Sequence, residues 1–187
     1  MDYIAFIAGL PEIDWDDRKL SLTVAEFREQ LKDYISGRDE RLIDLFFLPN
    51  DNAQVLRLLR KQEPDGALST VYPVKLLEDE IQEPDKTIPA YLREFIADFK
   101  EEHLRYDVSP ENVLSWMYYD YMMKADNQLV KRYAEFSMNL KNLVTALNAR
   151  KYGMEVAKEV IGSNEFAVAL RFDPGLSLCR KSDCFDG

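Results

Sequence analysis

FSMNLKNLVTALNARKYG, residues 136–153, has the residue spacing of an amphipathic helix. Its larger apolar side chains recur every three or four residues, which predicts one apolar face made of Phe136, Leu140, Leu143 and Leu147. Asparagine is a poor residue for the middle of a helix, because its amide competes for backbone hydrogen bonds. The stretch nevertheless carries three asparagines: Asn139, Asn142 and Asn148.

Two of the three asparagines fall on one line along the expected helix. A rotation of about 100° per residue places Asn139, Asn142, Ala146 and Arg150 in a lengthwise stripe at the edge of the apolar face, with Asn148 on the opposite flank. An unpaired amide at such a half-buried edge would cost about 1–3 kcal/mol. We therefore expect these side chains to hydrogen-bond to a neighbouring helix or loop of the same molecule, or else to contact a partner.

The preceding residues predict a central helix. Ser109 can cap it and Pro110 suits its first turn, while ENVLSWMYYDYMMKAD, residues 111–126, is apolar or aromatic nearly all round. WMYYDYMM could in principle line a flavin or haem pocket, but its helical spacing favours a buried core helix. Asp126 and Asn127 predict a break and a cap, and Gly153 closes the next helix. Further helices are expected in residues 88–104, 154–162 and 164–172.

The first half of the chain predicts shorter helices. Thr23 and Glu26 have the spacing of a capping box for a helix that Gly37 would end. A short helix in RDERLIDLFFLP should stop at Pro49, and Asp51 should cap a separate helix over 52–62. PVKLLEDEIQ, residues 73–82, predicts another helix. The first 13 residues are compatible with either a strand or a helix.

Prolines mark the middle of the chain as its least regular part. Residues 63–89 contain four of them: Pro64, Pro73, Pro84 and Pro89. We expect a boundary here between an N-terminal helical subdomain, residues 1–83, and a C-terminal helical subdomain, residues 84–187. Glycine and proline are otherwise sparse and helix-forming residues dominate, so the expected fold class is all-α, a multi-helix bundle.

Composition excludes several classes of protein. The 34 acidic and 24 basic residues give a net charge of −10, which repels phosphate backbones and argues against general nucleic-acid binding. No apolar run approaches the roughly 18 residues of a membrane-spanning helix, and the N-terminus lacks the basic region of a signal peptide. We expect a cytoplasmic protein without direct membrane insertion. Its cysteines, Cys179 and Cys184, could close a small loop under oxidising conditions, but the reduced form fits that compartment better.

The residues of catalysis and metal binding show no convergent pattern. His103 lies in the acidic stretch KEEHLR, which favours a solvated surface residue over a catalytic base. Cys179, Asp183 and Cys184 lack the second ligand pair of a zinc site. DWDDRK, with Asp14, Asp16 and Asp17, lacks the glycine and glutamate of a calcium loop and favours a solvated turn. The glycines are scattered singly, so no phosphate loop is expected. We expect no enzyme, cofactor or metal.

YYDYMMKADNQLVKRYAEFSMNLKNLVTALNARKYG, residues 118–153, resembles the repeat of the C-subunit family of V/A-type ATPases, whose eukaryotic relatives are the d-subunits. The matching features are the aromatic pair Tyr118 and Tyr119, then Leu129 and Tyr133, then the helix whose pattern reads Asn139, Asn142, Leu143, Thr145, Leu147, Asn148, Ala149 and Arg150. YIAFIAGLP, residues 3–11, resembles the start of a bacterial domain-of-unknown-function family encoded among V-type ATPase subunits.

The resemblance implies an all-helical, non-catalytic subunit. It would lie on the cytoplasmic side of the membrane rotor ring and receive the foot of the central shaft, with those shaft and ring subunits as partners and no cofactor. It implies structural or partner-contact roles for Asn139, Asn142, Arg150, Tyr119 and Tyr133. Two positions depart from the family pattern, since Asn139 replaces an acid and Asn148 replaces an arginine. An alternative is a free-standing helical protein-binding module with an unrelated partner.

Overall fold

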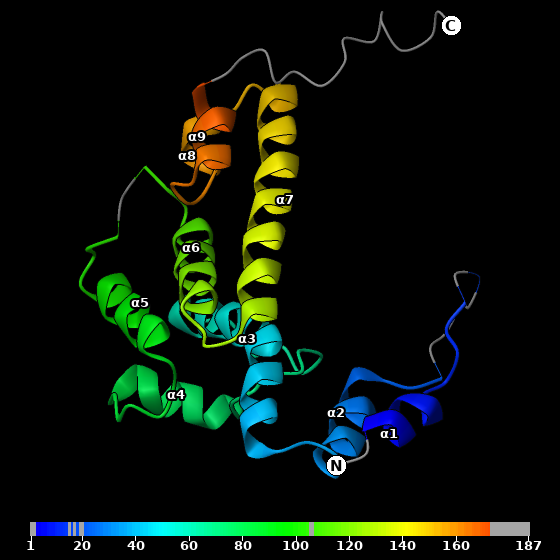
Figure 1. Cartoon of the computed structure of the whole chain (residues 1–187). Helices are drawn as coiled ribbons and strands as arrows, with labels where there is room; N and C mark the ends of the chain where they lie inside the picture. The colour runs from blue at the N-terminus through cyan, green and yellow to red at the C-terminus, as the bar shows by residue number, and fades with distance from the viewer. Residues whose placement is uncertain (1–2, 15, 17, 19–20, 105–106, 173–187) are drawn as a thin grey trace, which may run out of the picture. The chain divides into compact units, whose positions relative to one another are not determined.

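The structure is a computed structural model that describes residues 3–14, 16, 18, 21–104 and 107–172 (Figure 1). Within these residues the regular elements are all helices, so the expected all-α, multi-helix class is confirmed. The helices are α1 (Tyr3–Gly9), α2 (Val24–Lys32), α3 (Gly37–Leu59), α4 (Val74–Gln82), α5 (Ala90–Lys100), α6 (Pro110–Met123), α7 (Gln128–Tyr152), α8 (Val156–Glu159) and α9 (Glu165–Phe172).

The chain divides into two compact units, Met1–Leu76 and Leu77–Gly187. The first has a small core that includes Leu48 and Val55, and the second has a larger one that includes Phe95 and Met138. The subdomain division expected after residue 83 stays a prediction, because compactness does not test whether either part folds by itself.

In the first unit, the N-terminal residues form a helix rather than a strand. The ring of Phe6 on α1 lies 4.9 Å from that of Tyr34 and 5.9 Å from that of Phe27, measured between centroids. The expected capping box of α2 is confirmed: Glu26 N–H donates to Thr23 Oγ1 at 3.2 Å, and Thr23 N–H donates to Glu26 Oε2 at 2.8 Å. The aromatic contacts join the first two helices.

The expected break at Pro49 is wrong, since α3 runs through it from Gly37 to Leu59. Gly37 does not end the previous helix either: Ser36 caps α3, accepting from Asp39 N–H at 3.3 Å, and Gly37 is its first residue. A proline inside a helix costs about 3 kcal/mol. Burying apolar side chains such as Leu48 and Val55 offsets that cost at about 1.5–3 kcal/mol each.

The expected helix cap at Asp51 is also wrong, because this residue anchors a loop instead. Its carboxylate is fully buried within α3 and accepts from Val71 N–H and Tyr72 N–H, both at 2.9 Å. Burial raises the pKa of this carboxyl group, while the two backbone donors oppose that shift. Arg28 on α2 ties the same loop, donating to Thr70 O at 3.0 Å and pairing with Asp44 at 2.9 Å.

In the second unit, the helices predicted before residue 127 are confirmed. On α5 the buried side chains are Tyr91, Leu92, Phe95 and Ile96. Ser109 caps α6 by accepting from Asn112 N–H at 3.2 Å, and α6 exposes none of its large apolar side chains. Glu80 on α4, which is 3% exposed, accepts from Thr87 N–H at 2.7 Å and so fixes the turn into α5.

The cap and end of α7 match the prediction, but its packed face does not. Asn127 accepts from Leu129 N–H and Val130 N–H, and Gly153 ends the helix with φ 69°. The buried residues are Val130, Ala134, Met138, Asn142, Ala146 and Ala149, whereas Phe136 and Leu140 are 65% and 50% exposed. Small side chains on the buried face let α6, α8 and α9 pack closely against α7 (Figure 1). The expectation that Phe136 and Leu140 pack inside is therefore wrong.

Candidate functional site

Asn142 lies in the middle of the buried face of α7 and holds one residue of the segment between α8 and α9. Its side chain is 1% exposed, its Nδ2 donates to Ile161 O at 2.8 Å, and Ile161 N–H donates to its Oδ1 at 2.9 Å. Both ends of the amide are thus satisfied by one peptide position. The amide therefore pairs both the N–H and the C=O of Ile161, so that neither buried backbone group is left without a hydrogen bond.

Asn139 holds the same segment at a second point, and Arg150 holds α9. Asn164 Nδ2 donates to Asn139 Oδ1 at 2.9 Å, and Arg150 Nη2 donates to Leu170 O at 2.9 Å. Asn164 also accepts from Ala167 N–H at 2.9 Å, which is the geometry of an N-cap for α9. The three predicted polar residues of α7 therefore all reach the chain between Ile161 and Leu170. We call these contacts the α7 polar contacts.

The apolar layer beneath these contacts requires a glycine that the sequence analysis missed. Gly162 has φ 81°, and a Cβ at this position would lie 3.0 Å from Met138 Sδ and 3.1 Å from Trp116 Cζ3. The positive φ and the close approach of these two side chains both favour glycine here. The local sequence held a usable signal for Asn164, because Ser-Asn before an apolar run is a typical helix start. It held none for the approach of Gly162 to Met138.

Tyr119 and Tyr133 belong to a separate aromatic cluster nearer the start of α7. Tyr118 and Tyr119 have ring centroids 5.1 Å apart, and Tyr91 on α5 lies 5.1 Å from Tyr121. Burial raises the pKa of Tyr119, with the nearby Tyr133 adding to the shift. Burial likewise raises the pKa of Tyr118 above its ordinary range. These phenols stay neutral at physiological pH, and the cluster serves as packing.

The five predicted residues therefore fall into two groups rather than one site. Tyr133 precedes Asn142 by nine residues and Arg150 by seventeen, which is about 14 and 25 Å along a helix. Within the polar group, between Asn139 and Asn142, Lys141 Nζ donates to Ser115 Oγ on α6 at 2.6 Å, and burial lowers the pKa of that amine. Residues 139–150 of α7 are thus tied by hydrogen bonds to α6 and to residues 161–170.

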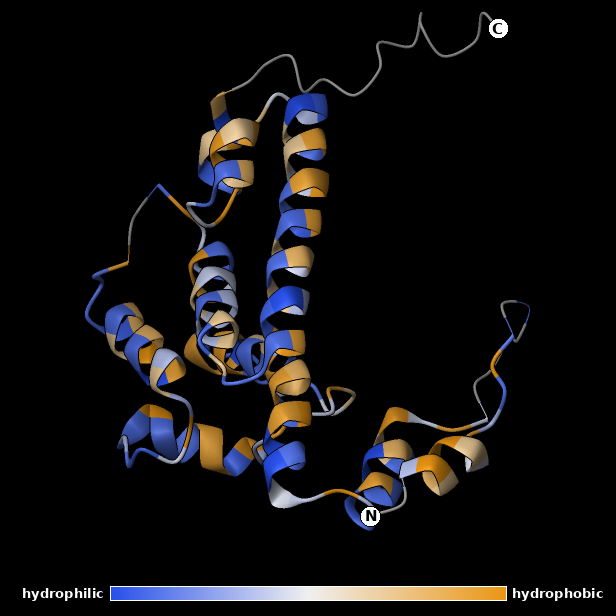
Figure 2. Cartoon of the chain, in the orientation of Figure 1, coloured by the Kyte–Doolittle hydropathy of each residue, from blue (hydrophilic) through white to orange (hydrophobic). Residues whose placement is uncertain are grey.

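The opposite side of α7 is apolar and largely exposed. Its exposed fractions are 74% for Leu129, 47% for Tyr133, 65% for Phe136, 50% for Leu140 and 50% for Val144. Figure 2 shows apolar residues along the length of this helix. Single exposed apolar residues are ordinary on a protein surface, whereas a continuous row of them marks an interaction site. With Leu143 and Leu147, which are half-buried, this row forms what we call the α7 outer face. Leu143 stands at its edge and also packs against the core cluster of Ala146, Val160, Ala167 and Leu170.

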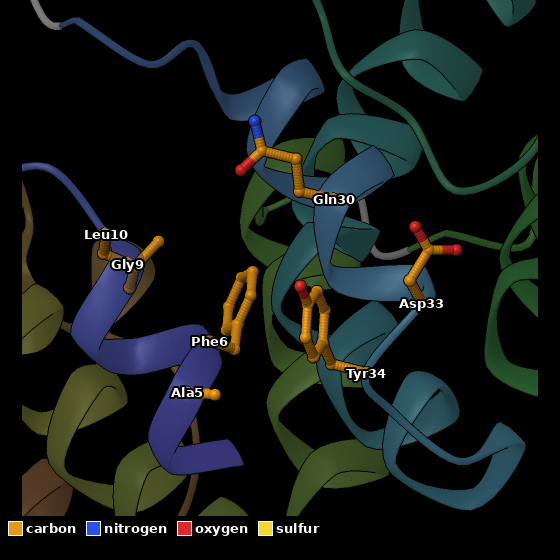
Figure 3. A pocket seen from close by; sticks show the side chains of 7 residues that line it. All are labelled: Ala5, Phe6, Gly9, Leu10, Gln30, Asp33 and Tyr34. Atoms are coloured by element: carbon orange, nitrogen blue, oxygen red, sulfur yellow. The ribbon is translucent and has the colours of Figure 1, made fainter. Parts of the chain in front are cut away.

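A small hollow in the first unit lies between α1 and the end of α2 (Figure 3). It has a volume of about 240 Å³ and is lined by Ala5, Phe6, Gly9, Leu10, Gln30, Asp33 and Tyr34. Sites for drug-sized ligands usually exceed about 300 Å³ and converge several polar groups. Figure 3 shows the ring of Phe6 beside that of Tyr34, with the carboxylate of Asp33 directed away from both. The hollow has no constellation for catalysis.

The remaining candidates are surface residues or lie outside the described residues. The side chain of His103 is 66% exposed, with Nδ1 3.2 Å from Glu101 Oε2. Asp14 and Asp16 are exposed, and Asp17, Cys179, Asp183 and Cys184 lie outside the described residues. In the part of the chain that the structure describes, no group of His, Cys, Asp and Glu has metal-binding geometry. Among the same residues, every helix is too short or too polar to cross a membrane.

Comparison with known proteins places the chain in one family. A family model described as "Protein of unknown function (DUF2764)" matches residues 1–174, a range that reaches into both compact units. Searches of the curated proteins and of the solved structures each found no match.

Proposed function

The chain belongs to the DUF2764 family, and from that premise we propose that it is a non-catalytic structural or assembly subunit of a V/A-type rotary ATPase. The proposal joins two lines of support. One is the resemblance of residues 118–153 to the C-subunit repeat. The other is the packing of α7 in the second unit, which favours the transmission of force along this helix.

The observation that carries the proposal is the bracing of α7. This helix has 25 residues, which is about 37 Å of length. The α7 polar contacts and Lys141 tie it at four points to α6 and to residues 161–170. A close-packed helix transmits displacement with little deformation, because interiors of protein density are hardly compressible. That property is what a subunit between a shaft and a membrane ring needs.

The two departures from the family pattern fit this proposal. Asn139, at the position of an acid in the C-subunit pattern that the chain resembles, bonds to Asn164 within the unit, so it needs no cationic partner. Asn148, at the position of an arginine in that pattern, is exposed and takes no part in the buried face. The net charge of −10 favours docking to basic loops of the shaft or ring, since charge complementarity sets specificity and encounter rate. The chain would then act at the cytoplasmic side, peripheral to the membrane.

Affinity isolation tests this function. A tagged chain is recovered from gently solubilised membranes of its native host, and the co-isolated proteins are identified. We expect central-shaft and ring subunits of the rotary ATPase. Asn142→Ala should reduce their recovery by loosening the packing of α7, and Asn148→Ala, at an exposed position of the same helix, should not. Recovery without any rotary-ATPase subunit would contradict the proposal.

A second candidate function is a free-standing helical protein-binding module with an unrelated partner. The observation that favours it is the exposed α7 outer face. A row of large apolar side chains that stays exposed is typical of a protein-binding surface. In this case the isolation would return a protein unrelated to rotary ATPases. The same partner would be lost on substitution within the outer face.

A further inference from the structure

The α7 outer face has the spacing of a coiled-coil seam. Leu129, Tyr133, Phe136, Leu140, Leu143 and Leu147 follow one another at intervals of four, three, four, three and four residues. This alternation keeps all six within about 40° of one line along the helix. Three of them, Leu129, Phe136 and Leu140, are at least half exposed. The face can thus pack against one partner helix that lies along α7.

We propose that a second copy of the chain covers this face, with the two α7 helices antiparallel. The six positions are symmetric in sequence about residue 138. In an antiparallel pair, each residue of the row in one copy therefore faces a residue of the row in the other. Leu129 then opposes Leu147 of the second copy, Tyr133 opposes Leu143, and Phe136 opposes Leu140. Each aromatic ring meets a leucine, and no layer sets two rings or two charges against each other. Self-complementarity of one patch is the requirement for a twofold-symmetric interface.

The flanking residues favour the antiparallel direction. Among the flanking positions, Ser137 and Asn139 meet their own counterparts near the twofold axis. Lys151, at the end of α7, lies near Asp126 of the second copy, which precedes its start, and both residues are exposed. A parallel pair would instead gather both copies of Lys151 at one end and both copies of Asp126 at the other. Opposite charges at each end therefore select the antiparallel pair.

The area available is sufficient for a specific dimer. Four of the six seam side chains, Leu129, Tyr133, Phe136 and Leu140, are 47–74% exposed. Together with the half-buried Leu143 and Leu147 they give on the order of 1,000 Å² for two copies, near the lower bound for a specific interface. The opposite face of α7 packs against α6, α8 and α9, and Leu143 at the edge of the row also packs against that core. The exposed Leu129, Phe136 and Leu140 remain available for pairing. The inference rests on this geometry alone and does not depend on the ATPase assignment.

The oligomeric state of the full chain tests the inference. Sedimentation over a range of micromolar concentrations should show a monomer–dimer equilibrium. Phe136→Glu should raise the dissociation constant by ~100-fold or more, because the charge enters a central layer twice. Phe172→Glu is the matched control: Phe172 is 75% exposed on α9 and lies outside the row. The control should leave the dissociation constant unchanged, and both variants should keep the wild-type circular dichroism spectrum.

Disulfide trapping tests the direction of the pair. In a Cys179→Ser, Cys184→Ser background, an equimolar mixture of Leu129→Cys and Leu147→Cys chains should form a mixed disulfide-linked dimer. Leu129→Cys alone should not. A dimer trapped by Leu129→Cys alone indicates a parallel pair and overturns the inference. So does a monomer at every concentration, or a dimer that Phe136→Glu leaves intact.

Discussion

Asn142 on α7 holds Ile161 by both ends of its amide, donating to the carbonyl at 2.8 Å and accepting from the N–H at 2.9 Å. The pair is buried and joins residues nineteen positions apart. It explains why an unfavourable helix residue stands at the middle of the longest described helix. The side chain replaces a backbone partner for a turn that would otherwise bury two unsatisfied groups.

Asn142→Leu should destabilise the protein although it adds apolar volume to the core. The change leaves Ile161 N–H and C=O without partners, which should lower the free energy of unfolding by about 2–4 kcal/mol. Urea unfolding of the variant checks this value against Asn148→Leu, at an exposed position of the same helix, which should stay within about 0.5 kcal/mol of wild type. Equal midpoints for the two variants would show that the contact is not stabilising.

Gly162→Ala should destabilise more than Gly153→Ala. Both glycines have positive φ, 81° and 69°, so both substitutions carry a backbone penalty of about 1 kcal/mol. Only Gly162 also lacks space, because its Cβ would press on Met138 and Trp116, whereas Gly153 has nothing within 4 Å. Thermal unfolding should rank wild type, Gly153→Ala and Gly162→Ala in falling order. An equal effect of both variants would remove the role assigned to close packing at Gly162.

Pro49→Ala should stabilise the first unit. Pro49 is exposed within α3, and alanine restores the helical N–H there without altering the core. After allowing for the larger entropy of the unfolded chain, we expect a gain of about 1 kcal/mol or more. Pro84→Ala, at an exposed position between α4 and α5, is the control and should give no gain. Unfolding at a lower urea concentration in Pro49→Ala would mean that α3 depends on its proline.

The sequence predicts the features of this fold that depend on neighbouring residues, and it fails for those that depend on contacts between distant parts of the chain. Caps at Thr23, Ser109 and Asn127, and the stop at Gly153, are local signals, and the structure confirms them. The predicted break at Pro49 is wrong because burial along α3 is a tertiary effect that outweighs a local penalty. The predicted packing of Phe136 and Leu140 is wrong because α7 has two apolar sides, and the prediction followed the side with the larger residues. The small side, Ala134, Ala146 and Ala149, packs because it permits close approach.

Alkaline pH should destabilise the second unit through its buried phenols. Burial raises the pKa of Tyr118 and Tyr119 above the unfolded value of about 10. A raised folded pKa means that the contribution of the neutral phenol is complete below about pH 10 and is lost as pH rises further. Unfolding measured across this range should show a shallower decline in Tyr118→Phe. Tyr152→Phe, at an exposed position on α7, should follow wild type, and a decline in Tyr118→Phe as steep as in wild type would contradict the assignment.

Binding to a purified rotary ATPase of the same host is the most direct test of the central claim. The complex and the purified chain are mixed and separated by size, and the fractions are examined for co-migration. We expect the chain to migrate with the complex at low salt, and to be released progressively as salt screens its acidic surface from basic shaft or ring loops. A chain that never migrates with the complex, at low salt and in excess over it, would contradict the account.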